Sequence, residues 1–263
     1  MIKLSQKAVI LARGLGTRMR DGLAEVTLTP EQQRFAGEGI KALIPVAGGR
    51  TLLELILENL TSVGFSEVCL VIGPEHDAIR DFCSSKELDV RFAVQDKPLG
   101  TADAVLAAEG CVAEDELFLV VNSDNLYPVD SLLRLRETNR SAMLAFEREA
   151  LIAHSNIPAE RIVKFATVEI DASGLLRRIV EKPERAVPRS FVSMNAWLFS
   201  PSIFAACRSI EPSERGEYEI TAAVQYAIDK QDEEFVAVKS DEGVLDLSSR
   251  SDIKGVSKFL KAK

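Results

Sequence analysis

Short apolar runs alternate with amphipathic segments through the first half of the chain. The pattern predicts buried strands over four runs bounded by glycine or polar residues: 8–12, 68–73, 90–95 and 117–122. It predicts helices in the segments between and after these runs: 51–63, 76–82, 101–109 and 129–138. Strands that alternate with helices indicate βαβ units, so we expect a mostly parallel sheet with helices on both faces.

After residue 140 the pattern changes to strands that lack long helices between them. Strands are expected over 142–146, 163–170, 175–181 and 191–199, with a hairpin-like turn at 171–174. Two helices (201–207 and 217–230), two short strands (235–238 and 244–247) and an amphipathic C-terminal helix follow. We expect this half to extend the same sheet as a mixed or antiparallel part of it, and not to form a separate domain.

Residues 19–40 are polar and show no sustained periodicity. We expect a long loop there, with a short helix near 30–35. Long loops inside compact domains are usually functional lids or disordered segments. This loop is therefore a candidate lid beside a ligand site.

Charge and composition exclude several classes of protein. The net charge of −8 and the pI of about 5.1 disfavour a general binder of nucleic acid or anionic membranes. No apolar run approaches the roughly 20 residues of a membrane span, and the N-terminus lacks a signal-peptide cleavage pattern. The four cysteines are scattered without a C-x-x-C motif, which indicates reduced thiols in a cytoplasmic protein. Two histidines are too few for a histidine-rich metal site.

A glycine-rich loop directly follows the first predicted strand. Gly14 and Gly16 lack a Cβ, so backbone N–H groups can approach an anion closely, and Thr17 and Arg18 add groups that suit phosphate. The loop is not a dinucleotide fingerprint, because Met19 stands where the third glycine would be, and the P-loop pattern is absent. An NAD(P)-dependent oxidoreductase is therefore disfavoured. For the loop alone, the alternatives are a phosphate cradle and a turn that binds no ligand.

Two carboxylates lie in strand-like surroundings. Asp124 follows the apolar run 117–122, and a carboxylate just beyond a buried strand is a common ligand of a hard cation such as Mg²⁺. Alternatively, it caps the turn that Asn125 and Pro128 also mark. Asp246 lies within a short apolar stretch, where an acidic residue either faces solvent or has a partner. Paired with Asp124, it could hold one Mg²⁺ against phosphate oxygens.

Other polar groups follow or interrupt predicted strands. Gln95 offers an amide that can read a nucleobase edge. Glu181 and Lys182 suit a sugar hydroxyl and a phosphate, although such charged pairs, like Lys41, are more often simply solvated. Asn195 lies in an otherwise apolar strand, and a buried amide needs partners, which favours a position facing a ligand.

Six segments, in order along the chain, resemble motifs of the sugar-1-phosphate nucleotidylyltransferase family. ILARGLGTRM is similar to the L-x-G-G-x-G-T-R-L signature, and KALIPV followed by a helix is similar to K-P-L-[ILV]-P-[VI]. QDKPLGTADA is similar to Q-x-x-P-x-G-T-A-x-A, and VVNSDN to the G-D-[NTV] segment that carries a metal carboxylate. EKP at 181–183 matches outright, and GEYEIT at 216–221 resembles G-E-[YL]-x-[IL]-T. The resemblance covers nearly the whole chain and keeps the motif order.

The resemblance implies one Rossmann-like (GT-A-like) α/β domain over residues 1–263, with a nucleotide-binding half (1–140) and a sugar-phosphate-binding half (141–263). It implies a Mg²⁺-dependent reaction in which a sugar-1-phosphate, or a similar phosphorylated alcohol, attacks the α-phosphorus of an NTP and pyrophosphate leaves. The partners would be these small molecules, without nucleic acid or membrane. The base, the sugar and a homo-oligomer stay open.

Carried over position by position, the resemblance also implies residue roles. Nucleotide-binding residues would be Ala12, Gly14, Gly16, Thr17, Gln95, Gly100 and Thr101; catalytic cations would be Arg18, Lys41 and Lys182; sugar ligands would be Glu181 and Asn195; and Mg²⁺ ligands would be Asp124 and Asp246.

The chain departs from the family pattern at several positions. Arg13 replaces the first glycine of the signature pair, Ala42 replaces the proline after the lysine, and Ser123 replaces the glycine before the metal carboxylate. Asp246 lacks the usual W-x-D-x-G-T context. These departures leave a second hypothesis, a non-catalytic module that binds a nucleotide or sugar nucleotide on the same fold. Consumption of an NTP would exclude it.

Overall fold

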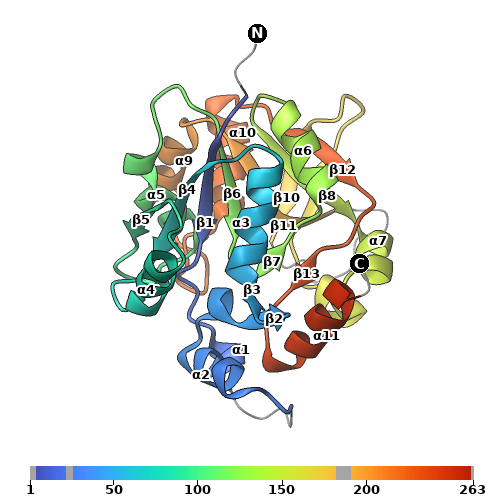
Figure 1. Cartoon of the computed structure of the whole chain (residues 1–263). Helices are drawn as coiled ribbons and strands as arrows, with labels where there is room; N and C mark the ends of the chain where they lie inside the picture. Colours follow the sequence, from blue (N-terminus) through green and yellow to red (C-terminus); the bar gives the residue numbers. More distant parts are fainter. Residues whose placement is uncertain (1–3, 22–25, 182–190, 262–263) are drawn as a thin grey trace.

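A mixed nine-stranded sheet forms the centre of the protein, for which the computed structural model describes residues 4–21, 26–181 and 191–261. Its strands are β1 (Lys7–Leu11), β4 (Glu67–Ile72), β5 (Val90–Val94), β6 (Phe118–Asn122), β8 (Ala142–Glu147), β9 (Thr167–Ile170), β10 (Leu176–Val180), β11 (Phe191–Phe199) and β12 (Val236–Ser240). Their order is β10-β9-β11-β6-β1-β4-β5, with β8 paired to β11 and β12 paired to β8 (Figure 1).

Four neighbouring strands, β6-β1-β4-β5, are parallel, as the alternation of strands and helices predicts. β11 is antiparallel to β6, β8 and β9, so the second half extends the same sheet with mixed pairing. Because parallel strands end at one edge of a sheet, the segments after β1, β4, β5 and β6 meet there. This edge is where the predicted phosphate loop, Gln95 and Asp124 come together.

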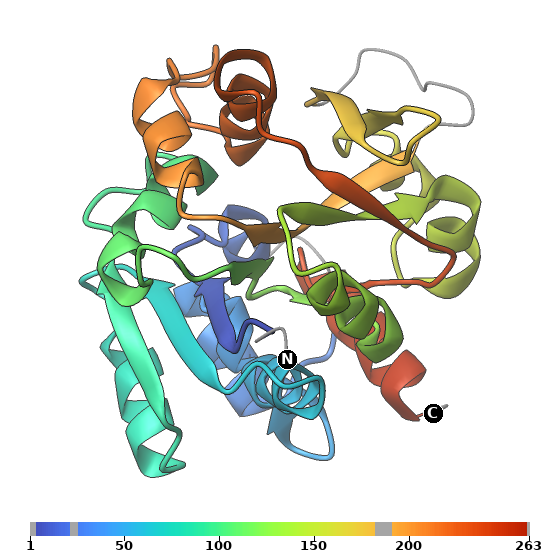
Figure 2. The ribbon, with the colours of Figure 1, turned by 90° about the horizontal axis from the view of Figure 1, so that it is seen from above.

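Helices cover both faces of the sheet. They are α1 (Thr17–Arg20), α2 (Pro30–Glu38), α3 (Leu52–Ser62), α4 (Asp77–Ser85), α5 (Thr101–Ala107), α6 (Val129–Glu137), α7 (Arg148–His154), α8 (Ala159–Ile162), α9 (Ile203–Ser209), α10 (Ile220–Gln231) and α11 (Arg250–Lys261), with 3₁₀ turns η1 (Lys41–Leu43) and η2 (Glu109–Cys111). Figure 2 shows α3 on one side of the sheet and the orange α9 on the other. Side chains alternate along β1 accordingly: Ala8 and Ile10 pack into the core on the α3 side, and Val9 packs into the core on the α9 side.

Two small antiparallel sheets lie beside the central one: β2 (Pro45–Ala47) with β3 (Arg50–Thr51), and β7 (Asn125–Leu126) with β13 (Leu245–Asp246). The helix predicted over 51–63 is α3, and it begins with a capping box in which Thr51 and Glu54 bond each other's backbone nitrogens. The pairing of β7 with β13 places Asp246 opposite Asn125, one residue from Asp124.

Two segments differ from the sequence prediction. The expected strand over 163–170 is wrong over its first half: only Thr167–Ile170 is extended, and α7 and α8 precede it. Val163 caps α8 and is 36% exposed, and the backbone N–H groups of Val163 and Phe165 bond back to α8, so these apolar residues belong to the end of a helix. Within 19–40, α2 begins at Pro30 as expected, after a capping box formed by Thr29 and Gln32, but it continues to Glu38, where the left-handed Gly39 ends it. The last two residues of α1 also lie within 19–40, and Met19, one of them, anchors this helix because its side chain is fully buried.

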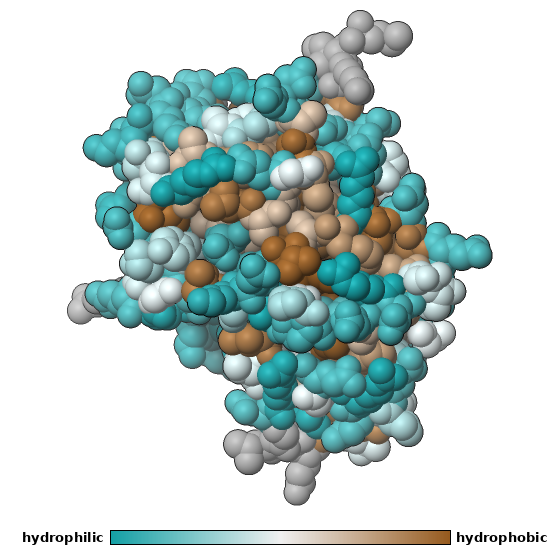
Figure 3. Space-filling model, turned by 90° about the vertical axis from the view of Figure 1, so that its left-hand side faces the viewer, coloured by the Kyte–Doolittle hydropathy of each residue, from teal (hydrophilic) through white to brown (hydrophobic). Residues whose placement is uncertain are grey.

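The surface on the side of the edge strand β5 is mostly polar, with separate apolar patches (Figure 3). Val94, at the end of β5, and Leu99 are among the large apolar side chains that are exposed. Within the described part of the chain, no helix combines the length and apolar character that crossing a bilayer requires.

Candidate active site

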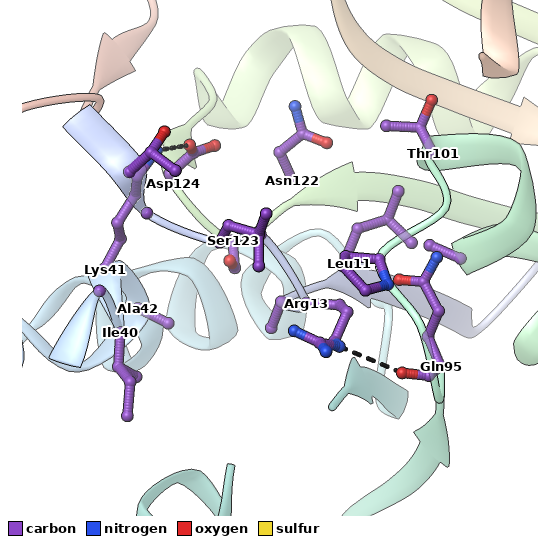
Figure 4. Close-up of a pocket in the computed structure, with 18 of the residues that line it drawn as sticks. Leu11, Arg13, Ile40, Lys41, Ala42, Gln95, Thr101, Asn122, Ser123 and Asp124 are labelled. Atoms are coloured by element: carbon purple, nitrogen blue, oxygen red, sulfur yellow. Dashed lines mark hydrogen bonds and ion pairs between the residues drawn. The ribbon is translucent and has the colours of Figure 1, made fainter. Parts of the chain in front are cut away.

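A cavity of about 450 Å³ opens at the carboxyl edge of the parallel strands (Figure 4). Ten of the residues predicted from the sequence line it: Ala12, Gly14, Gly16, Thr17, Arg18, Lys41, Gln95, Gly100, Thr101 and Asp124. They come from the loop after β1, from η1, from the segment after β5 and from the end of β6. The fold therefore gathers residues that lie more than a hundred positions apart in the sequence around one cavity.

The glycine loop is held against the end of α2. Gly16 has a φ of +59°, and a Cβ there would come within 2.7 Å of the Cα of Gly39. Gly39 is left-handed too, and its own Cβ would lie 2.8 Å from the carbonyl oxygen of Leu15. The two glycines thus allow a close backbone approach that other residues would prevent. Gly14, by contrast, faces open space, which leaves its backbone accessible from the cavity that it lines.

The side-chain amide of Gln95 has a fixed orientation. Its Nε2 donates to the carbonyl oxygen of Gly100 at 3.0 Å and to Oδ2 of Asp103 at 2.7 Å. Both partners are acceptors only, so the nitrogen must face them. The amide oxygen is then the polar end that remains for a ligand.

Arg13, the residue that stands where the motif has a glycine, lies beside Gln95. Its Nε donates to the backbone oxygen of Gln95 at 3.1 Å, as Figure 4 shows, and its Nη1 lies 2.7 Å from Oε1 of Glu75. The side chain is buried although Glu75 is half-exposed. The added cation therefore lines the cavity next to Gln95, the residue that is predicted to contact the base.

Lys41 and Asp124 form an ion pair at the opposite side of the cavity. Lys41 Nζ lies 2.8 Å from Asp124 Oδ2. The Lys41 side chain is 20% exposed and the Asp124 side chain is 25% exposed. Arg18 is exposed at the cavity wall and has no hydrogen-bond or ion-pair partner among the described residues. The cavity thus combines cations that suit phosphates with a carboxylate that suits a metal ion.

The second half of the chain supports the segment after Gln95. A Cβ at Gly100, where φ is +122°, would lie 2.6 Å from the backbone nitrogen of Tyr218. Tyr218 N donates to the carbonyl oxygen of Leu99, and Ile220 N donates to the hydroxyl of Thr101 at 2.8 Å. The Thr101 hydroxyl therefore has a structural partner at the start of α10, although Thr101 lines the cavity.

Asp246 lies close to Asp124 but not at the cavity wall. Burial, with a contribution from the charge of Asp124, raises the pKa of Asp246 to about 6. The residue is only 4% exposed, and both carboxylate oxygens have partners. Asn125 Nδ2 and Ser248 Oγ donate to Oδ1 at 3.1 and 3.0 Å, and Arg161 Nη1 donates to Oδ2 at 2.8 Å.

Asp124 fits a divalent cation better than Asp246 does. Carboxylate oxygens are the ligands that Mg²⁺ prefers, and Asp124 presents them at the cavity. The Asp246 carboxylate already accepts three bonds, one of them from the Arg161 cation, so a divalent cation would compete with that ion pair. Across residues 4–21, 26–181 and 191–261 there is no cluster of three or more His, Cys, Asp or Glu side chains arranged to hold a metal ion.

The predicted sugar ligands lie outside the cavity. Glu181 accepts from Thr221 Oγ1 at 3.3 Å, and desolvation raises the pKa of Glu181. Asn195 sits at a bulge of β11 with a φ of +57°, where its Oδ1 accepts from Trp197 Nε1 at 3.4 Å. Asparagine tolerates this backbone region, so Asn195 also has a structural reason to be there. Lys182 lies outside the described residues.

The nucleotidyl transferase family model matches residues 7–263. The chain belongs to this family. The match confirms the resemblance read from the six motifs. For a member of this family, the chain departs from the motif pattern at Arg13, which supports Gln95, and around Asp246, which is bonded to Arg161.

Curated relatives are similar over most of this chain. A low-salt glycan biosynthesis nucleotidyltransferase of Haloferax volcanii is 30% identical over 233 residues, which is 85% of this chain and 59% of the relative. A glucose-1-phosphate thymidylyltransferase of Streptomyces griseus is 33% identical over 229 residues, 85% of this chain and 57% of the relative. A UTP–glucose-1-phosphate uridylyltransferase of Haloferax volcanii is 27% identical over 227 residues, 84% of this chain and 83% of the relative. The chain spans less than three fifths of the length of the first two.

A solved structure of UDP-glucose pyrophosphorylase complexed with UDP-glucose shares the fold, with a TM-score of 0.75 over 100% of both chains at 18% identity. The expected α/β fold, with a largely parallel central sheet flanked by helices, is thereby confirmed.

Three residues to which the sequence assigned no role, Arg161, Tyr127 and the motif departure Arg13, bond site residues or their neighbours. Arg161 bonds Asp246, and Arg13 bonds Gln95. Tyr127, fully buried, donates its hydroxyl to the carbonyl oxygen of Met194 at 2.6 Å, and burial raises its pKa. The replaced glycine was a signal for Arg13. No pattern in the sequence connects Arg161 with Asp246, because the two lie 85 positions apart.

Proposed function

We propose that this protein is a nucleotidylyltransferase that joins an NTP to a sugar-1-phosphate, or a similar phosphorylated alcohol, with release of pyrophosphate. One observation carries the proposal: the glycine loop with Arg18, the Lys41–Asp124 pair and the oriented amide of Gln95 all face one cavity of about 450 Å³. A cavity of this size and polarity accommodates a nucleotide. The printed names of the relatives support the same reaction class.

The reaction needs positioning and charge stabilisation and little covalent work from the protein. In the proposed arrangement, the exposed N–H groups near Gly14 and the side chains of Thr17 and Arg18 hold the phosphates that leave as pyrophosphate. Lys41, already at the cavity, neutralises charge that builds up around the α-phosphorus. An acceptor phosphate oxygen then attacks in line with the departing pyrophosphate.

We infer that the base is uracil or thymine. The Gln95 amide presents an oxygen, and this acceptor matches the N3–H donor of these two bases. At the same ring position cytosine has an acceptor, which would face the amide oxygen without a proton between them. The thymidylyltransferase and uridylyltransferase names among the relatives agree with this choice.

Mg²⁺ is part of the proposal, with Asp124 as its ligand from the chain. When bound, the ion would offset the negative charge of the phosphate groups. We further propose the division into a nucleotide-binding half (1–140) and a sugar-phosphate-binding half (141–263), and a cytoplasmic location, where NTPs are available. Glu181, Lys182 and Asn195 remain proposed sugar-phosphate contacts, with a bound substrate as the test.

A second candidate function is supported by one feature. The ion pair between Arg161 and Asp246 engages a carboxylate that was expected to take part in metal binding. A chain with such a site can bind a sugar nucleotide without turning it over. Binding without pyrophosphate release would support this reading.

The test is pyrophosphate release with Mg²⁺ across UTP, dTTP, CTP, ATP and GTP, each with a panel of sugar-1-phosphates. We expect release with UTP or dTTP and at least one sugar phosphate. Asp124→Asn should abolish release while the protein stays folded, and the exposed Asp115→Asn, in the turn before β6, is the matched control. Turnover that survives in Asp124→Asn would refute the metal assignment, and silence across the panel would refute the proposed reaction.

A further inference from the structure

Arg161 is fixed between two carboxylates. Its Nη1 and Nη2 bond Asp252 Oδ2 and Oδ1 at 2.9 and 2.6 Å, and the same Nη1 bonds Asp246 Oδ2 at 2.8 Å. A two-pronged contact of this kind sets the plane of the guanidinium as well as its position. The side chain is 17% exposed, so this is a largely buried arrangement.

Asp252 is itself anchored at the start of α11. Its Oδ2 accepts from the backbone nitrogens of Ser248 and Ser249 and from the hydroxyl of Ser249, at 3.2, 2.8 and 2.8 Å. Arg161 therefore does not depend on Asp246 for its position. Arg161 is held by Asp252, which is itself fixed at the start of α11, and in this position it also bonds Asp246.

Asp246 is held from its other side as well. Asn125 and Ser248 donate to its Oδ1, and Asn156 bonds both its backbone nitrogen and its backbone oxygen, each at 2.8 Å. Moving this carboxylate toward the cavity would break several of these bonds together. Asp124, in contrast, lines the cavity with one lysine as its partner.

We propose that Arg161 is a positioning residue that withholds Asp246 from metal binding, so that a divalent cation in this cavity takes Asp124 without Asp246. The two neighbouring carboxylates are each balanced by a side-chain cation, Lys41 at Asp124 and Arg161 at Asp246. Only the first of these pairs is at the cavity. This inference deepens the proposed function and rests on its metal requirement.

The test measures metal affinity directly and needs no turnover. Mn²⁺, which takes the same oxygen ligands as Mg²⁺, is titrated into the protein without nucleotide, and free Mn²⁺ is followed by electron paramagnetic resonance. Loss of a true ligand lowers affinity by about tenfold or more. Asp124→Asn should show such a loss, whereas Asp246→Asn should change the affinity by less than about threefold.

Substitution of Arg161 supplies the decisive comparison. Arg161→Met should release Asp246 and raise Mn²⁺ affinity by about tenfold, and Asp246→Asn added to it should remove the gain. Arg161→Lys keeps a cation and should stay close to the original affinity, which guards against a methionine variant that fails to fold. A role confined to stability would lower the melting temperature without this Asp246-dependent gain.

A loss of Mn²⁺ affinity in Asp246→Asn equal to that in Asp124→Asn would overturn the proposal, as would an unchanged affinity in folded Arg161→Met. Both readouts are independent of the reaction. If pyrophosphate release failed while the Mn²⁺ pattern held, the proposed function would fall and the role of Arg161 would stand.

Discussion

Arg13 Nε donates to the backbone oxygen of Gln95 across 3.1 Å, so a side chain in the glycine loop fixes the start of the segment predicted to contact the base. The same guanidinium, itself buried, forms an ion pair with the half-exposed Glu75. Arg13, which departs from the family motif, is thus bonded to Gln95, which matches its motif. The base end of the cavity depends on this link.

Arg13→Met should weaken nucleotide binding more than it slows the chemical step. The substitution leaves the Gln95 oxygen without this donor and Glu75 without its cation, which together destabilise the fold by about 1–3 kcal/mol. We expect the KM for the NTP to rise by about tenfold with a smaller change in kcat. Steady-state kinetics check this, with the exposed Arg91→Met as control. An unchanged KM would contradict the link.

Asp103→Asn should relax discrimination between UTP and CTP. Asp103 accepts from Gln95 Nε2 at 2.7 Å and so keeps the amide oxygen toward the base. An asparagine can donate as well as accept, so the Gly100 carbonyl oxygen alone would then oppose the reversed amide, which turns a donor toward the N3 acceptor of cytosine. The ratio of kcat/KM for CTP to that for UTP should rise by roughly three- to tenfold. A constant ratio at reduced overall activity would instead show that Asp103 acts on stability alone.

Gly16→Ala and Gly14→Ala should separate stability from binding. Gly16 needs a positive φ and touches Gly39, so its substitution should cost about 1–3 kcal/mol of unfolding free energy. Gly14 has open space around it, so alanine there should leave stability within about 0.5 kcal/mol while it raises the KM for the NTP. Urea denaturation measures the first effect and kinetics the second. Equal destabilisation by the two substitutions would contradict the packing of the loop.

Glu219 gives a pH dependence of stability with a definite sign. Burial and the nearby charge of Glu181 raise the pKa of Glu219 from 4.5 to about 7. The folded protein therefore holds this proton more tightly than the unfolded chain does. The contribution to stability is complete below pH 4.5 and is lost as the pH rises toward 7.

Glu219→Gln should remove this dependence. At pH 8 the variant should be more stable than the original by about 1 kcal/mol, and at pH 4.5 the difference should vanish. Urea denaturation at the two pH values checks this, with the exposed Glu214→Gln as control. The same difference at both pH values would show that the loss of the Arg215 ion pair, not the proton, determines the result.

Local patterns predicted most of the elements because their signals lie within a few residues. Thr51 and Glu54 start α3 by a capping box that is readable from spacing. Residues 8–11 of β1, 68–72 of β4 and 118–121 of β6 are all apolar because both faces of the sheet are covered. The strand expected at 163–166 is absent because Val163 caps the end of α8 and is 36% exposed, and an apolar residue alone does not distinguish a helix end from a strand.

The candidate site was likewise predictable only in part. Residues after parallel strands could be placed together, because such strands end at one edge, and the cavity confirms that they meet there. The bonds from Arg161 to Asp246 and from Arg13 to Gln95 could not be foreseen. They depend on how α8 and the glycine loop pack, and neither is encoded by spacing along the chain.

The most direct test of the proposed function follows a label from substrate to product. UTP labelled at the α-phosphate is incubated with Mg²⁺, glucose-1-phosphate and the protein, and the products are separated. The account predicts that the α-label moves into a UDP-sugar while a label at the γ-phosphate appears in pyrophosphate. If the α-label stays in UTP, and likewise in labelled dTTP, for this sugar phosphate and for a panel of others, while the folded protein binds the nucleotide, the chain binds nucleotides without transferring them, and the proposed reaction is wrong.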